Sequence, residues 1–113
     1  MPQVNISIAQ KLDEKTMNDF QLEIGNNMNL LPGKTLDNTI IRIIDGCSIF
    51  KGGKPLDGAF VEVRLFKASP EENKKAFAEK IFSIFKAKLN IEPGAIYMNY
   101  LELDHWASNG NYN

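Results

Sequence analysis

The stretch Met1-Pro2-Gln3-Val4-Asn5-Ile6-Ser7-Ile8 opens the chain with apolar residues at every second position after the proline. This alternation predicts a β-strand with one buried face, which we expect over Gln3 to Ala9. The pattern returns 57 positions later as Val61-Glu62-Val63-Arg64-Leu65, and the same offset places Phe20 on Phe77. The chain is therefore expected to contain an internal repeat.

The first half continues with a helix and a second strand. Asp13 or a neighbour can begin a helix that runs to about Leu31, weakened at Gly25 and ended by Pro32-Gly33. Its apolar stripe consists of Met17, Phe20, Ile24, Met28 and Leu31. The β-branched run over residues 38–45 predicts a buried strand.

The second half shows the same order. Residues 59–67 predict a strand, and Ser69-Pro70-Glu71-Glu72 predicts a helix start with Ser69 as cap and Glu72 completing a capping box. The helix ends near Asn90, and residues 96–103 predict the last long strand. Its apolar stripe consists of Phe77, Ile81, Ile84, Phe85 and Leu89. Between the halves, residues 48–50 suggest a short strand before a turn over residues 51–55.

Each half reads as strand, helix, strand, which is a βαβ unit. Right-handed crossovers place both helices on the same side, so we expect an α+β fold with a four-stranded mixed sheet and two helices on one face. The chain is then a single domain over residues 1–113, with pseudo-repeats at about 2–45 and 59–103. The other face of the sheet keeps apolar residues and no helix to cover it, so we expect self-association.

Composition excludes several classes of protein. The 113 residues are 43% hydrophobic and 24% charged with a net charge near −1. The chain therefore lacks the excess of positive charge that is typical of proteins that bind nucleic acid or an anionic membrane. No apolar run approaches the length of a membrane helix and no leader is evident, so we expect a cytoplasmic protein. The single cysteine, Cys47, excludes an internal disulfide, and the single histidine, His105, gives no metal site.

Pro2 is a candidate catalytic residue because removal of Met1 would leave a secondary amine at the start of a strand. A free α-amine titrates near pH ~8, and apolar surroundings lower that value. Such an amine can act as a general base at neutral pH. The alternative is that Pro2 is an ordinary second residue.

The chain as a whole resembles the tautomerase superfamily, and its macrophage migration inhibitory factor branch in particular. The resemblance rests on the second-position proline, the duplicated βαβ pattern and four short segments. These are Pro32-Gly-Lys-Thr35, Phe50 with Gly52-Gly53, Ile96-Tyr-Met-Asn-Tyr100, and Trp106-Ala-Ser-Asn-Gly-Asn-Tyr112. The turn at Phe50 carries one inserted residue relative to the Phe-Gly-Gly of that branch.

The resemblance implies a homotrimer with sites at the subunit boundaries and the helices outside. It implies that Pro2 is the catalytic base and that Lys34 receives a substrate carboxylate. Tyr97 and Asn99 would line the pocket from a neighbouring subunit, and Phe66 takes the place of a smaller apolar residue. Without the resemblance, Lys34 is a solvated loop lysine and the Tyr97–Asn99 pair is a core tyrosine beside its hydrogen-bond partner.

The implied reaction is cofactor-free keto–enol tautomerisation of a 2-oxo acid such as phenylpyruvate. The alternative is a binding or signalling protein of the same fold in which the activity is vestigial. Gly58 and Val61 stand where some members of the branch have Cys-x-x-Cys, so thiol–disulfide activity is not expected. The stretch Phe66-Lys67-Ala68-Ser69 lacks the arginines of the dehalogenase branches.

Overall fold

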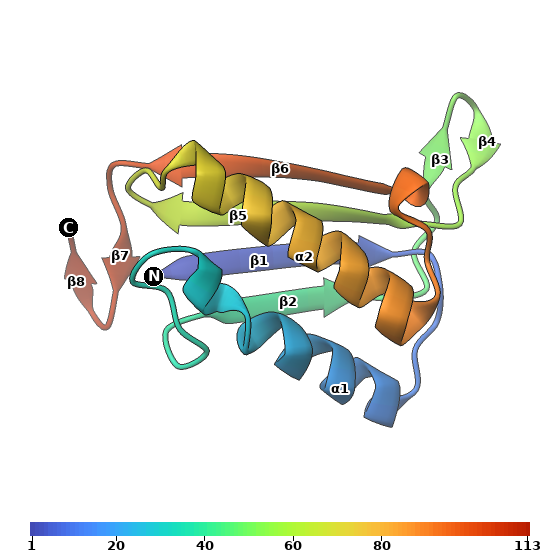
Figure 1. The fold of residues 1–113 in the computed structure, drawn as a ribbon, viewed down its shortest axis with the longest axis horizontal. Helices are drawn as coiled ribbons and strands as arrows, with labels where there is room; N and C mark the ends of the chain where they lie inside the picture. The colour runs from blue at the N-terminus through green and yellow to red at the C-terminus, as the bar shows by residue number, and fades with distance from the viewer.

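The computed structural model describes all residues from 1 to 113 and contains one four-stranded mixed sheet with the strand order β2-β1-β5-β6. Both helices lie on the same face of this sheet, as Figure 1 shows. The strands are β1 (Pro2–Ile8), β2 (Ile40–Ile44), β5 (Ala59–Phe66) and β6 (Ile96–Leu103), and the helices are α1 (Glu14–Gly25) and α2 (Glu71–Leu89). β1 is parallel to β2 and antiparallel to β5, and β5 is parallel to β6. The predicted fold class is confirmed.

The core lies between the helices and one face of the sheet. Alternate residues of β1 and β5 point into it, and both predicted helix stripes supply the opposite wall. The rings of Phe20 and Phe85 join the two helices edge to face, with centroids 4.9 Å apart. Burial of each such side chain stabilises the fold by about 1.5–3 kcal/mol, so the two stripes account for the docking of both helices.

Helix α1 is shorter than the sequence predicts, because it ends at Gly25 rather than near Leu31. Asp13 caps its start, with the carboxylate accepting the Thr16 N–H at 2.7 Å. After Gly25 the chain forms a 3₁₀ turn over Met28–Leu30, which still buries Met28. The side chain of Asn27 donates to the carbonyl of Glu23 at 2.8 Å. This bond competes with the backbone hydrogen bonds of the helix just after Gly25, where helix propensity is already low.

The predicted capping box at Ser69 is wrong. Pro70 is extended, with ψ of 144°, so α2 begins at Glu71 and no side chain caps it. The backbone N–H of Ser69 instead donates to Glu102 at 2.6 Å. At its other end, α2 stops at a left-handed Asn90 with φ of 56°, where the sequence places the end.

Strand β2 is an edge strand and not the buried strand that its β-branched run predicts. It pairs only with β1, and its residues alternate between exposed and half-buried. Ile40 and Ile44 are 50% and 44% exposed on the face away from the helices. The same open face exposes Phe60 and Leu101, so one chain alone leaves apolar surface uncovered.

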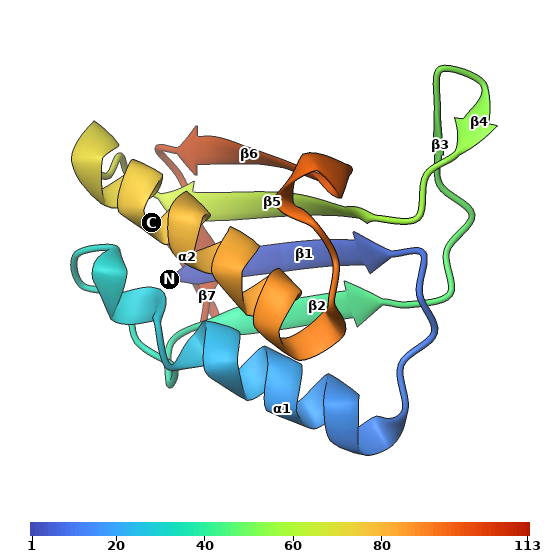
Figure 2. The same ribbon diagram turned by 45° about the vertical axis from the view of Figure 1, so that its right-hand side comes forward.

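Two small hairpins project from opposite ends of the molecule (Figure 1), and the first of them also stands clear of the sheet in the turned view of Figure 2. The first joins β3 (Phe50–Lys51) to β4 (Lys54–Pro55) through Gly52 and Gly53, whose φ angles of 61° and 78° require glycine. The second joins β7 (Ala107–Ser108) to β8 (Asn111–Tyr112) and was not predicted from the polar tail. None of the helices is both long and apolar enough to span a membrane.

Candidate functional site

The start of β1 is built into the sheet. Pro2 is buried and lies opposite Leu65 of β5. Pro2 is the first residue of this antiparallel pair, so Met1 lies just beyond it, next to the end of β5 at Phe66. The first backbone nitrogens therefore lie beside the end of β5, close to Phe66.

The terminal amine at this position has a lowered pKa. Burial is the main cause and lowers the pKa below the ordinary value of 8.0, and the charge of Lys34 together with a hydrogen bond to it lowers it further. Lys34 therefore lies close to the start of β1. With Met1 in place, the nitrogen of Pro2 itself is an amide.

Lys34 is held by an ordered loop. Its backbone N–H donates to Leu31 at 3.0 Å. The amide of Asn38 accepts from the Thr35 N–H at 2.9 Å and donates to Gly33 at 3.2 Å. Lys34 is half-buried and has no carboxylate within ion-pair distance, so its ammonium is free to receive an anion.

Phe66 forms an aromatic wall at the same end of the sheet. Its ring lies 6.4 Å from the ring of Trp106, just before β7. The ammonium of Lys67 lies 5.2 Å from the centre of the Phe66 ring. The Phe66 ring therefore has both an indole and a cation as neighbours.

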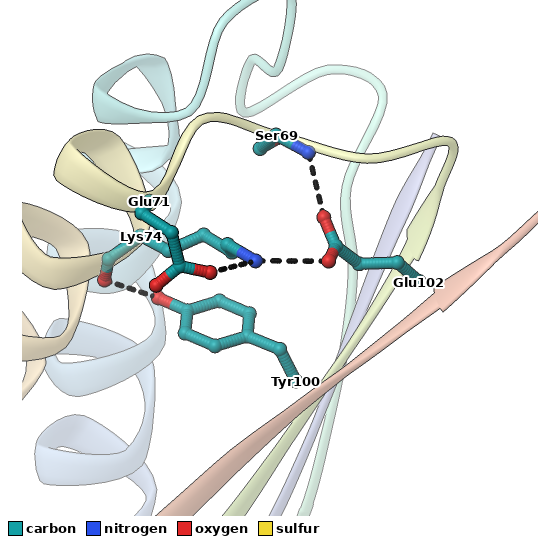
Figure 3. Close-up of polar contacts among 5 residues, drawn as sticks. All are labelled: Ser69, Glu71, Lys74, Tyr100 and Glu102. Atoms are coloured by element: carbon teal, nitrogen blue, oxygen red, sulfur yellow. Dashed lines mark hydrogen bonds and ion pairs between the residues drawn. The ribbon is translucent and has the colours of Figure 1, made fainter.

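The loop after β5 is fixed by a polar network, drawn in Figure 3. The Lys67 N–H donates to Leu103 at 2.7 Å. Glu102 accepts from the Ser69 N–H at 2.6 Å and from the ammonium of Lys74 at 2.8 Å. Lys74 also pairs with Glu71 at 2.9 Å, and its carbonyl accepts from the Tyr100 hydroxyl at 2.6 Å. The network binds the first turn of α2 to the last residues of β6.

The network also shifts the pKa values of its members. The hydrogen bond from Lys74, then that from Ser69, lowers the pKa of Glu102. Hydrogen bonds to Glu102 and Glu71 raise the pKa of Lys74. Burial raises the pKa of Tyr100 well above its ordinary range. Tyr100 therefore stays neutral and donates its hydroxyl proton.

Tyr97 and Asn99 lie away from Pro2 within one chain. Tyr97 is opposite Phe60, which is opposite Ser7, five residues along β1 from Pro2. At about 3.3 Å per residue, Tyr97 is therefore displaced from Pro2 by roughly 17 Å along the strand direction. One chain therefore joins Pro2, Lys34 and Phe66 but does not bring Tyr97 or Asn99 to them.

Tyr97 belongs to a separate hollow beside the β3–β4 hairpin. A cavity of about 190 Å³ is lined by Ile49, Phe50, Lys51, Leu56, Phe60 and Tyr97. The ammonium of Lys51 lies 5.4 Å from the centre of the Tyr97 ring. A larger hollow of about 570 Å³, which includes Gln10, Asp57 and Glu92 in its lining, contains none of the predicted site residues.

Sequence reasoning missed Lys67 and the network around Glu102. The left-handed backbone at Lys67 has no signal in the sequence, because that conformation usually marks glycine. From the sequence, Glu102 is an ordinary polar residue of a strand. Only the structure places Ser69 and Lys74 beside it. The exposed His105 stacks on Tyr112 with ring centres 5.7 Å apart, and no three His, Cys, Asp or Glu side chains gather as a metal site.

No family model matches the sequence, and no curated protein matches it. Solved structures match over nearly the whole chain. Leishmania major MIF2 matches with a TM-score of 0.90 and 20% identity, covering 100% of this chain and 97% of that one. A fused 4-OT asymmetric trimer matches with a TM-score of 0.82 and 12% identity, covering 96% and 94%.

A protein named Pt0534, crystallised after inactivation by 2-oxo-3-pentynoate, matches with a TM-score of 0.80 and 14% identity, covering 96% of this chain and 93% of that one. These identities are low, and the agreement lies in the path of the backbone. The chain therefore has the fold of the tautomerase superfamily, to which the macrophage migration inhibitory factor and 4-OT structures belong.

Proposed function

We propose that the protein is a cofactor-free keto–enol tautomerase that acts on 2-oxo acids such as phenylpyruvate, with Pro2 as general base once Met1 is removed. The observation that carries the proposal is the position of the buried Pro2 at the start of β1 with Lys34 beside the chain terminus, where burial and the charge of Lys34 lower the pKa of the Met1 amine. Burial and a neighbouring cation both disfavour the protonated amine. The same two causes would act on a Pro2 amine at nearly the same place.

The reaction moves one proton between an oxygen and a carbon. The free Pro2 amine takes the proton from the enol hydroxyl, and the resulting ammonium returns a proton to C3, which leaves the keto acid and the free amine. The carboxylate of the substrate pairs with Lys34, whose charge also stabilises the enolate that develops between the two transfers. The carbonyl and carboxylate already acidify the carbon, so these residues suffice for the chemistry.

We propose a homotrimer because a single chain leaves the site incomplete. Tyr97 lies at the other end of the sheet from Pro2 and Asn99 lies midway along β6, and the open face exposes Phe60 at 41% and Leu101 at 47%. Association of open faces would cover this surface and bring Tyr97 and Asn99 of one copy toward Pro2 of another. The similar 4-OT structure is named as a trimer. Sedimentation that shows a stable monomer at micromolar concentration would contradict this assembly.

The substrate class has support from one of the similar structures. The compound that inactivated Pt0534, 2-oxo-3-pentynoate, is itself a 2-oxo acid. Lys34 supplies a free cation for the carboxylate that such acids share. No contact in the structure favours the alternative of a binding or signalling protein with vestigial activity.

The proposal is tested with protein whose N-terminus is defined by mass. The loss of Met1 is first verified, and ketonisation of freshly dissolved enol-phenylpyruvate is then followed by its ultraviolet absorbance. Turnover well above the buffer rate supports the proposal. If processed protein turns over neither phenylpyruvate nor any other enolised 2-oxo acid, the function is not that of a tautomerase.

A further inference from the structure

Gly25 is a glycine whose own backbone does not require one. It is the buried last residue of α1, and its φ lies outside the left-handed region in which other glycines of the chain are found. Glycine is also among the poorest helix formers, so its presence here weakens the end of α1. The reason for a glycine at this position therefore lies in what packs against it.

The side chain of Leu36 occupies the space that a side chain at Gly25 would need. A Cβ atom built on Gly25 would lie 2.2 Å from Cδ1 of Leu36 and 3.5 Å from its Cγ. Carbon atoms make favourable contact only at about 3.5 Å or more, so the Cδ1 methyl could not stay where it is. Leu36 thus docks its loop against α1 at a place that only a glycine leaves open.

Hydrogen bonds close the loop around Leu36 into a compact unit. The Thr35 N–H donates to the side chain of Asn38 at 2.9 Å, and the Asn38 N–H donates to the Thr35 hydroxyl at 3.3 Å. The hydroxyl of Thr39 donates to the Thr35 carbonyl at 2.6 Å, and the Thr39 N–H donates to the Leu36 carbonyl at 3.3 Å. Lys34 directly precedes this unit, so a displacement of Leu36 is passed on to Lys34.

We infer that Gly25 and Leu36 are positioning residues for Lys34, because the contact between them fixes how closely the Lys34 loop docks on α1. The contact thereby sets the place of the Lys34 ammonium beside the amine at the start of β1. The consequence for turnover rests on the proposed tautomerase function, whereas the consequence for the amine does not. The charge of Lys34 and its hydrogen bond both lower the pKa of that amine, and both effects weaken with distance.

An NMR titration of the terminal amine tests the inference without turnover, in protein whose N-terminus is defined by mass. Gly25→Ala should raise the pKa of the amine toward 8.0, because the added methyl group pushes Leu36 and with it Lys34 away. Gly94→Ala is the matched control, since its methyl group meets no atom within 4 Å, and it should keep the wild-type pKa.

A second substitution should reverse the effect. Gly25→Ala combined with Leu36→Val removes one methyl group where one was added, and such volume-conserving changes are tolerated best. The wild-type pKa of the amine should return in this double variant. Leu36→Ala removes the contact without touching α1, and it should raise the pKa as Gly25→Ala does, so it decides the test if Gly25→Ala does not fold.

Kinetics of the processed protein separate this inference from the proposed function. At about pH 9 the amine is mostly unprotonated in every variant, so protonation does not affect the comparison. Gly25→Ala should raise KM for phenylpyruvate by about 3–10-fold and leave kcat within about twofold, because Lys34 is displaced while Pro2 stays in place. The double variant should restore KM.

An amine pKa that is unchanged in folded Gly25→Ala and Leu36→Ala, or one that the double variant does not restore, would overturn the positioning role. If these variants also turn over phenylpyruvate with the wild-type KM, only the positioning role fails and the tautomerase stands. If the pKa shifts and returns as expected in a protein that turns over no 2-oxo acid, the positioning of Lys34 is supported and the tautomerase is overturned.

Discussion

The ammonium of Lys74 lies 2.8 Å from a carboxylate oxygen of Glu102, and it joins the first turn of α2 to the end of β6. The same turn reaches the loop that precedes Lys34, because the side chain of Asn73 donates to Leu30 at 3.1 Å. Glu102 and Pro2 both lie opposite Leu65, so the ion pair stands two strands from the proposed base. We conclude that the start of α2 connects the separate segments that carry the site.

Replacement of Glu102 by Gln should make unfolding less sensitive to acid. Hydrogen bonds depress the folded-state pKa of Glu102 below its ordinary 4.5. Its stabilising contribution is therefore full above pH 4.5 and is lost as the pH falls through the depressed value. Urea midpoints at pH 7 and pH 3 should differ more in the wild type than in Glu102→Gln. Glu79→Gln, on the exposed side of α2, should behave as the wild type, and equal pH dependence in all three would contradict the prediction.

Replacement of Phe77 by Ala should lower the free energy of unfolding by about 3–5 kcal/mol, because the ring is fully buried and a cavity remains. Chemical denaturation measures this loss. The half-buried Phe82 on the same helix offers a matched control, and Phe82→Ala should lose clearly less. Similar losses in the two variants would mean that α2 does not pack as described.

Replacement of Lys34 by Ala should raise KM for phenylpyruvate by roughly 10–100-fold, since a charged hydrogen bond contributes about 1.5–3 kcal/mol. Lys34→Arg should recover part of this loss because the charge remains while its geometry changes. Steady-state kinetics and a thermal melt of each variant provide the measurement. Wild-type kinetics in Lys34→Ala would make Lys34 an ordinary loop lysine.

Replacement of Lys67 by Gly should stabilise the protein by up to about 1 kcal/mol, because glycine adopts the left-handed backbone without strain. Urea denaturation at pH 7 measures the change. Lys67→Met keeps the strain and should show no gain. A loss of stability in Lys67→Gly would indicate that the lysine side chain stabilises the fold itself.

The sequence predicts the fold well because its two signals are periodic and local. The alternation of Val4, Ile6 and Ile8 and the stripe of Phe77, Ile81 and Phe85 correspond directly to buried faces. The errors arise where tertiary contacts decide. β2 is rich in β-branched residues but lies at the edge of the sheet. The backbone N–H of Ser69 donates to Glu102, 33 residues away in the sequence, and the Ser69 side chain does not cap α2.

The site was predictable only in part. The proximity of Lys34 to the start of β1 agrees with the resemblance to the tautomerase superfamily, whereas the roles of Pro2, Phe66, Tyr97 and Asn99 remain predictions. Lys67 could not be anticipated, because a lysine gives no sign of a left-handed backbone. Tyr97 and Asn99 could not be placed beside Pro2 from one chain, since the sheet holds Tyr97 at the opposite end and Asn99 midway along β6, two strands away from β1.

The catalytic role of Pro2 is tested most directly by comparing processed protein with a variant that carries an alanine between Met1 and Pro2, in which the proline nitrogen is an amide. For the processed protein, ketonisation of enol-phenylpyruvate should rise with pH through a pKa below 8.0, as the amine loses its proton. The insertion variant should keep its fold and lose at least about 100-fold in rate, the lower range for a general base. Equal rates for the two proteins would contradict the assignment of Pro2 as the base.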